Sequence, residues 1–247
     1  MARIRHLSNA PITEALVDFR VVLPAAFEPS HFRRVDEHLR VDFPYIEEHK
    51  SAQAIVKFAE GRPATEMRDL GLTGVWIKSP DGKSIGQFRT DGFTFNRLKP
   101  YTSWEEILPT ALRLWDEYAR LASPEVVTRV ALRYINHLTL PPTSADLDQL
   151  ITTAPRLPQD IPQFLNGFLT RVVLQDAARS LNANFTQALE VGVQTQLPTL
   201  LLDIDAYRLG QFPPQRGVLE RHLGELRSYK NAIFFGSLTE DFIRSFE

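Results

Sequence analysis

The segment ITEALVDFRVV, residues 12–22, has the pattern of a strand with two chemically different faces. One face of an extended chain would carry the apolar residues Ala15, Val17, Phe19 and Val21. The opposite face would carry Glu14, Asp18 and Arg20, together with Leu16. Because side chains alternate sides along a strand, this period of two predicts a strand that a hydrophobic core covers on one side only.

A strand of the same design begins the second half of the chain, in VVTRVALRYINHLTLP, residues 126–141. Its segment VALRYIN, residues 130–136, aligns with ALVDFRV, residues 15–21. In both halves the opening strand precedes a short helix, three or four strands and a long helix, so each half reads β-α-β(3-4)-α. We therefore predict an internally duplicated α+β protein, in one domain with half-repeats of about 1–122 and 123–247.

Turn and helix signals give the expected elements. Asp81-Gly82 and Asp91-Gly92 are typical of the tight hairpins that connect antiparallel neighbours. Helical spacing of apolar residues indicates a short helix around Ser30–Leu39 and two long helices, at about Ser103–Leu121 and Gln215–Ala232.

These elements predict one curved antiparallel sheet of about eight to ten strands, with both long helices on its convex face. By the order of its elements this plan resembles the TATA-box-binding protein, an analogy of topology that implies no function. Two independent domains are the alternative, although no linker rich in glycine and serine separates the halves.

The composition is that of an ordinary globular chain. Of 247 residues, 43% are hydrophobic and 23% are charged, and the net charge of −2 gives no general attraction to nucleic acid. The absence of cysteine excludes disulfides and thiolate chemistry. The N-terminus lacks the apolar core of a signal peptide, and no uncharged apolar run approaches the roughly 20 residues that cross a bilayer. We expect a cytoplasmic protein without a membrane partner.

Four blocks of the sequence carry a family resemblance. They are PITEALVDF (11–19), GFTFNRLKPYTSWEEI (92–107), LRYINHL (132–138) and SYKNAIFFGSLTEDF (228–242). Together they resemble a family of uncharacterised prokaryotic proteins described as sporadically distributed. The resemblance extends over nearly the whole chain, and its most specific residues are Phe95-Asn96-Arg97 with Tyr101 and Trp104, and Arg133-Tyr134-Ile135-Asn136. It implies a single unit with no assigned activity. A patchy distribution is typical of accessory genes, including those of defence systems.

The standard catalytic signatures are absent from the sequence. It contains no Walker loop, no Gly-x-Gly-x-x-Gly, no Gly-x-Ser-x-Gly and no His-Glu-x-x-His. We therefore expect a binding or regulatory protein without a catalytic site or cofactor, which presents the concave face of its sheet to a protein or an anionic ligand. Nucleic acid is an alternative partner, because basic and aromatic residues alternate in the first half, at Lys78, Arg89, Trp76 and Phe93.

The predicted ligand-binding residues come from the strands. Arg133 and His137 share one face of the second opening strand with Arg129, and Arg20 lies on the corresponding face of the first. If these strands pair at the middle of the sheet, their guanidinium groups meet on the concave surface, where they could bind phosphate or carboxylate. The alternative is that the arginines pair with Asp18 and other aspartates across the strands. Two further candidates, for which the fold offers no obvious reason, are Asn96 and Arg97.

Asp203 and Asp205 support an alternative function. In LLDIDAY both carboxylates fall on one face of a strand, where they could hold Mg²⁺ or Mn²⁺ in a hydrolase or nuclease. Such a site needs a third acidic ligand, which the sequence does not place. The simpler interpretation is a solvated strand face.

Assembly is a further alternative. An open sheet has two edges that need protection, and Phe234, Phe235 and Phe242 near the C-terminus could anchor an interface. Either feature would support a homodimer.

Overall fold

The computed structural model describes residues 5, 7–59, 62–140, 147–163, 165–191 and 197–247. Within these residues, nine strands form one antiparallel sheet in the order β2-β3-β4-β5-β1-β6-β9-β8-β7. The predicted α+β class and the single large antiparallel sheet are therefore confirmed. The strands are β1 (Ile12–Val22), β2 (Tyr45–Ala59), β3 (Arg62–Lys78), β4 (Ser84–Arg89), β5 (Gly92–Leu98), β6 (Val126–Thr139), β7 (Phe168–Asp176), β8 (Leu181–Val191) and β9 (Pro198–Phe212). The helices are η1 (Pro29–Arg34), α1 (Glu37–Asp42), α2 (Trp104–Ala122), η2 (Leu147–Gln149), α3 (Arg216–Gly236) and α4 (Glu240–Arg244).

The opening strands β1 and β6 pair at the centre of the sheet. Val17 of β1 lies opposite Leu132 of β6 on one side and opposite Phe95 of β5 on the other. All three side chains are buried. The apolar residues of β1 thus lie on the same face of the sheet as those of its two neighbours, and together they form one apolar face.

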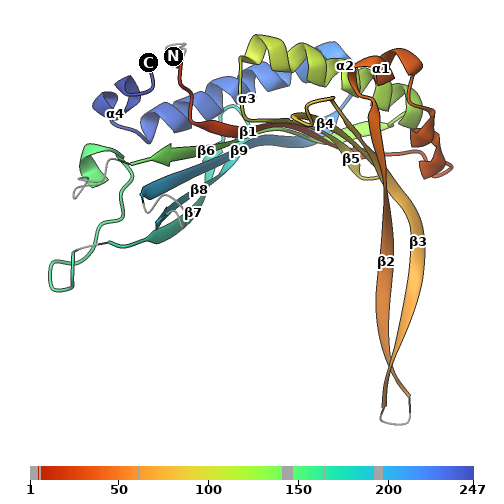
Figure 1. The fold of residues 1–247 in the computed structure, drawn as a ribbon, viewed down its shortest axis with the longest axis horizontal. Coiled ribbons are helices and arrows are strands. Elements are labelled where there is room, and N and C mark those ends of the chain that lie inside the picture. Colours follow the sequence, from red (N-terminus) through yellow and green to blue (C-terminus); the bar gives the residue numbers. More distant parts are fainter. Residues whose placement is uncertain (1–4, 6, 60–61, 141–146, 164, 192–196) are drawn as a thin grey trace.

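Helices α2 and α3 lie across this apolar face (Figure 1). Trp115 of α2 is fully buried and packs edge-on against Phe19 of β1, with ring centroids 4.8 Å apart. Helix α3 contributes three buried leucines, which are Leu219, Leu223 and Leu226. Burying one leucine side chain contributes about 1.5–3 kcal/mol, so this helix–sheet layer is the main source of stability.

The region predicted as one helix near Ser30–Leu39 is divided into η1 and α1. Between them Val35 and Asp36 are extended, with ψ angles of 132° and 137°. The Asp36 carboxylate accepts a hydrogen bond from the backbone N–H two residues later. Asp36 therefore caps α1, and this local bond competes with a continuous helix.

Strands β2 and β3 form a hairpin that leaves the body of the sheet. β3 pairs with β4 only over Gly74–Lys78, whereas it pairs with β2 along almost its whole length. In Figure 1 the hairpin extends away from the body on the side opposite the helices. Because an isolated two-stranded ribbon is marginally stable in water, the projecting part contributes little to the stability of the core.

The two halves arrange their strands similarly around the central pair. The last strand of each half, β5 or β9, lies next to the opening strand of that half. The internal duplication itself stays a prediction.

Gly92 tests how closely the backbone of β5 approaches that of β1 at the centre of the sheet. Its φ angle is 155°, and a Cβ atom there would collide with the backbone oxygen of Phe19. We expect Gly92→Ala to lower the free energy of unfolding by more than about 3 kcal/mol in urea denaturation. Gly82→Ala is the matched control, because Gly82 also has a positive φ, of 66°, but has open space around it; it should cost about 1–2 kcal/mol. Equal costs for the two variants would contradict this packing.

Candidate functional site

The face of the sheet opposite the helices is polar, and we call it the open face. It is formed by the side chains that alternate with the core residues of each strand. Its central members are Asp18 and Arg20 of β1, Arg129, Arg133 and His137 of β6, and Asp203 and Asp205 of β9. The fold thus brings most of the predicted site residues onto one surface.

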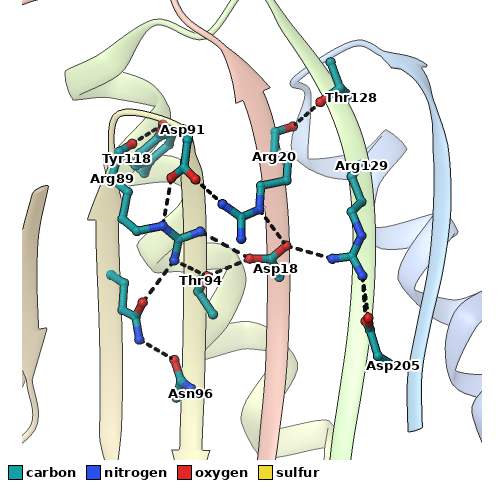
Figure 2. Close-up of polar contacts among 11 residues, drawn as sticks. Asp18, Arg20, Arg89, Asp91, Thr94, Asn96, Tyr118, Thr128, Arg129 and Asp205 are labelled. Carbon is teal, nitrogen blue, oxygen red and sulfur yellow. Dashed lines mark hydrogen bonds and ion pairs between the residues drawn. The ribbon is translucent and has the colours of Figure 1, made fainter. Parts of the chain in front are cut away.

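Arg129 connects three strands of the open face (Figure 2). Its guanidinium donates to Asp18 Oδ1 at 2.9 Å and to both carboxylate oxygens of Asp205, at 2.7 and 2.8 Å. The side chains of Arg129, Asp18 and Asp205 are only 21%, 15% and 20% exposed. These ion pairs are therefore screened less by water and salt than pairs on an ordinary surface.

Asp18 extends this network towards the first half of the sheet (Figure 2). The Thr94 hydroxyl donates to it at 2.7 Å, and nitrogen atoms of Arg89 and Arg20 lie 3.4 and 3.5 Å from its oxygens. Arg89 donates to Asp91 at 2.9 Å, and Arg20 pairs with the same carboxylate. The network therefore runs through side chains of β4, β5, β1, β6 and β9.

The remaining predicted ligand-binding residues divide between the two faces. Arg133 donates to both carboxylate oxygens of Asp203 on the open face, at 2.8 and 2.6 Å. Asn96 also faces this side, where its amide oxygen accepts a hydrogen bond from a glutamine of β4 at 3.2 Å. Arg97 points to the helix side and donates to a serine hydroxyl of β4 at 3.0 Å. Adjacent residues of a strand face opposite ways, so Asn96 and Arg97 cannot bind one ligand together.

His137 is exposed near the end of β6, beside an apolar row of the open face. The strand register places it opposite Leu201 of β9. The same row continues across the sheet through Ala188 of β8 to Leu169 of β7. Leu169 is 74% exposed, and Val173 on the same face of β7 is 65% exposed. β7 is the edge strand of the sheet, so among the described strands it has a neighbour on one side only. Exposed apolar side chains therefore lie on a strand whose outer edge could pair with another chain.

The two carboxylates of the alternative metal site are already paired with cations. Asp203 binds Arg133, whereas Asp205 binds Arg129 and accepts a hydrogen bond from Asn184 at 3.0 Å. Over the residues that the structure describes, no group of three His, Asp or Glu side chains is placed to hold a metal ion. Mg²⁺ or Mn²⁺ would have to displace a guanidinium group from each carboxylate.

Lys230 of α3 is a buried candidate that none of the predicted sites includes. It is 8% exposed, and its Nζ lies 3.8 Å from the centre of the Tyr134 ring. Burial, and to a lesser extent the neighbouring Arg227, lower the pKa of the Lys230 ammonium to about 7. Helical spacing in the sequence indicates that Lys230 is buried, because it continues the buried stripe of Leu219, Leu223 and Leu226.

Comparison with models of known protein families finds no match, and comparison with curated proteins finds none either. The resemblance to the sporadically distributed family therefore stays a prediction. Among the described residues, no helix is long and apolar enough to cross a membrane.

Arg129→Met tests how much the ion-pair network contributes to the free energy of unfolding. The substitution leaves the half-buried carboxylates of Asp18 and Asp205 without their shared cation. We expect it to lower the free energy of unfolding by about 1–3 kcal/mol in urea denaturation. Arg33→Met, which removes the exposed pair with Glu48, should have a much smaller effect. A loss at Arg129 no larger than that at Arg33 would contradict the network's role.

Lys230→Met tests the buried charge through the pH dependence of stability. Below pH 7 the ammonium is charged in both the folded and unfolded states, so the full cost of its burial is present. Between about pH 7 and 10 the folded state releases the proton first, and the unfolding free energy of the wild type rises by up to about 1.4 kcal/mol per pH unit. The variant lacks this contribution. Burial raises the pKa values of Tyr101 and Tyr134, so neither phenol titrates in this range.

The measurement is urea unfolding of the wild type and the Lys230→Met variant at pH 6 and pH 9. Relative to the wild type, the variant should be most stable at pH 6, and its advantage should shrink by about 1–3 kcal/mol at pH 9. An identical difference at the two pH values would show that the Lys230 ammonium is solvated in the folded state.

Proposed function

We propose that this protein is a non-catalytic binding or regulatory module that holds a protein partner against the open face of its sheet. The observation that carries the proposal is the continuous ion-pair network on that face. It supplies a preorganised polar surface at the centre of the sheet, with little side-chain entropy left to lose on binding. A role in an accessory or defence-type gene context is part of the proposal and rests on the family resemblance alone.

The balance of charge on the open face favours a protein over an anionic ligand. Each of its central arginines is already paired with an aspartate, as seen for Arg20, Arg89, Arg129 and Arg133. A phosphate group approaching this surface would meet carboxylates as well as guanidinium groups, so the gain from binding would be small. The same argument disfavours nucleic acid, whose binding depends on unpaired positive charge.

Two features beside the network suit a protein surface. The apolar row that ends at Leu169, together with Val173, offers the kind of hydrophobic contact that protein interfaces bury beside polar groups. The β2–β3 hairpin projects on the side opposite the helices (Figure 1), and could close around a partner. A second copy of the chain, paired through the β7 edge, is one form that the partner could take.

The duplication of a β-α-β(3-4)-α unit belongs to the same proposal. Its support is the matched placement of β5 and β9 beside the opening strands, which gives each half an equivalent part of the open face. A divalent-metal-dependent hydrolase or nuclease using Asp203 and Asp205 remains the alternative. It requires both carboxylates to release their arginines.

The binding proposal is tested by disabling the apolar end of the open face. The double variant Leu169→Asp, Val173→Asp places charges on side chains that are already solvent-exposed, so the fold should persist. Val41→Asp is the control, because Val41 is 77% exposed and belongs to α1, a helix that Figure 1 shows on the helix side of the sheet. Proteins captured from the native host by the wild type are then purified and tested for direct binding to all three proteins.

We expect the purified partner to bind the wild type and the Val41 variant equally, and to bind the double variant at least ten-fold more weakly. Sedimentation at several protein concentrations covers the case in which the partner is a second copy. Equal binding of the double variant would reject the open face as the interface.

The choice of a protein over nucleic acid has its own measurement. Fluorescence anisotropy of single-stranded and double-stranded oligonucleotides should show no binding to the wild type at about 150 mM salt. Tight binding that weakens steeply with added salt would contradict the proposal, because such a slope reports phosphate contacts.

A further inference from the structure

A small cavity of about 90 Å³ lies on the helix side of the sheet, between the start of β1, the end of β6 and the helices α2 and α3. Its walls include the aromatic rings of Tyr101, Trp104, Tyr134 and Phe234. Asn136 of β6 and Lys230 of α3 supply polar groups to the same cavity. It is separate from the open face, because Tyr134 and Asn136 alternate with Arg133 and point to the opposite side of β6.

Segments that are far apart in the sequence converge on this cavity. Each of the four blocks singled out in the sequence contributes to its lining, through Pro11, Tyr101, Tyr134 and Lys230 among others. Core packing alone explains the rings. It does not explain a lysine at this position, since an apolar side chain would fill the same space without a desolvation cost.

Lys230 is the unbalanced charge of the cavity. Among the described residues, three cationic side chains line it, and two of them have carboxylate partners: Arg227 pairs with Glu105 at 3.2 Å, and Arg5 pairs with Glu240 at 2.8 Å. Over the described residues, the Lys230 ammonium makes no hydrogen bond or ion pair with the protein, and its contact is with the face of the Tyr134 ring. Buried ammonium groups are ordinarily paired, so this one lacks a counter-ion.

We propose that the cavity is a binding site for a small monocarboxylate, whose carboxylate group pairs with Lys230 and whose apolar body packs against the surrounding rings. One unpaired positive charge selects a ligand with one negative charge. The first turn of α2 also lines the cavity, and the positive end of this 19-residue helix favours an anion there. Asn231 can orient the carboxylate by donating a hydrogen bond from its amide. The amide nitrogen of Asn136 already donates to the backbone oxygen of Leu202 at 3.0 Å.

The size of the cavity limits the acid. A cavity of about 150 Å³ accepts benzene, so a space of about 90 Å³ suits acids of roughly two to four carbons. Acetate, propionate and isobutyrate are therefore suitable probes. Isobutyramide is the matched neutral control, because it has almost the shape of isobutyrate and lacks its charge.

The test is calorimetric or NMR titration of these four compounds into the wild type, Lys230→Met and Lys83→Met. Lys83 is exposed at the β3–β4 turn and controls for loss of a positive charge elsewhere. At pH 6 we expect at least one acid to bind the wild type and the Lys83 variant alike, and the Lys230 variant at least ten-fold more weakly. Isobutyramide should not bind.

A measurement on the wild type alone keeps the proposal testable if Lys230→Met fails to fold. Arg5, Arg227, Glu105 and the two tyrosines also line the cavity, and the Lys230 pKa of about 7 places the loss of its charge between pH 6 and pH 9. Affinity for the acid should therefore fall at least ten-fold over this range. The proposal is overturned if no acid binds the wild type at pH 6, or if affinity is indifferent to Lys230 or to pH.

Discussion

The antiparallel pairing of β1 with β6 sets the arrangement of the whole sheet. It places Val17 beside Leu132 on the helix side and brings Asp18 within reach of Arg129 on the open face. A slip of one residue would turn charged side chains into the core and apolar ones into water. The register of this pair therefore fixes both the core and the open face, and the remaining strands extend from it on either side.

The ion pairs of the open face specify this register more than they stabilise it. A half-buried guanidinium loses hydration when it pairs, so the net gain from each contact is modest. Arg129 between Asp18 and Asp205 nevertheless favours one register, because a shift of either neighbouring strand would break one of its ion pairs. A protein that presents its sheet to a partner needs such a fixed surface, and the proposed function uses it.

The sequence predicts the environment of a residue where that environment depends on the residue's neighbours along the chain. The alternation in residues 12–22 predicts which side of β1 is buried, and the pairing of Asp18 with arginines follows once the opening strands are placed together. The position of Arg97 also follows from alternation, since it must face away from Asn96. The break between η1 and α1 depends on the capping hydrogen bond of Asp36. The helical spacing of apolar residues does not reveal this bond.

Other features depend on contacts between distant segments and could not be predicted. Lys230 fits the apolar stripe of α3 by spacing, but its lack of a counter-ion appears only when α2, β1 and β6 enclose it. The length of the β2–β3 hairpin beyond the sheet depends on where β4 ends. The exposure of Leu169 follows from β7 being the last strand of the sheet, which is a property of the strand order.

We propose that a partner binds across the open face and its β7 edge, and hydrogen exchange of the protein, free and saturated with its purified partner, measures this contact. We expect slower exchange of the β7 amides and of the β2–β3 hairpin in the complex, with no change in α1 and α2. Protection confined to the helices, with β7 unchanged, would contradict it.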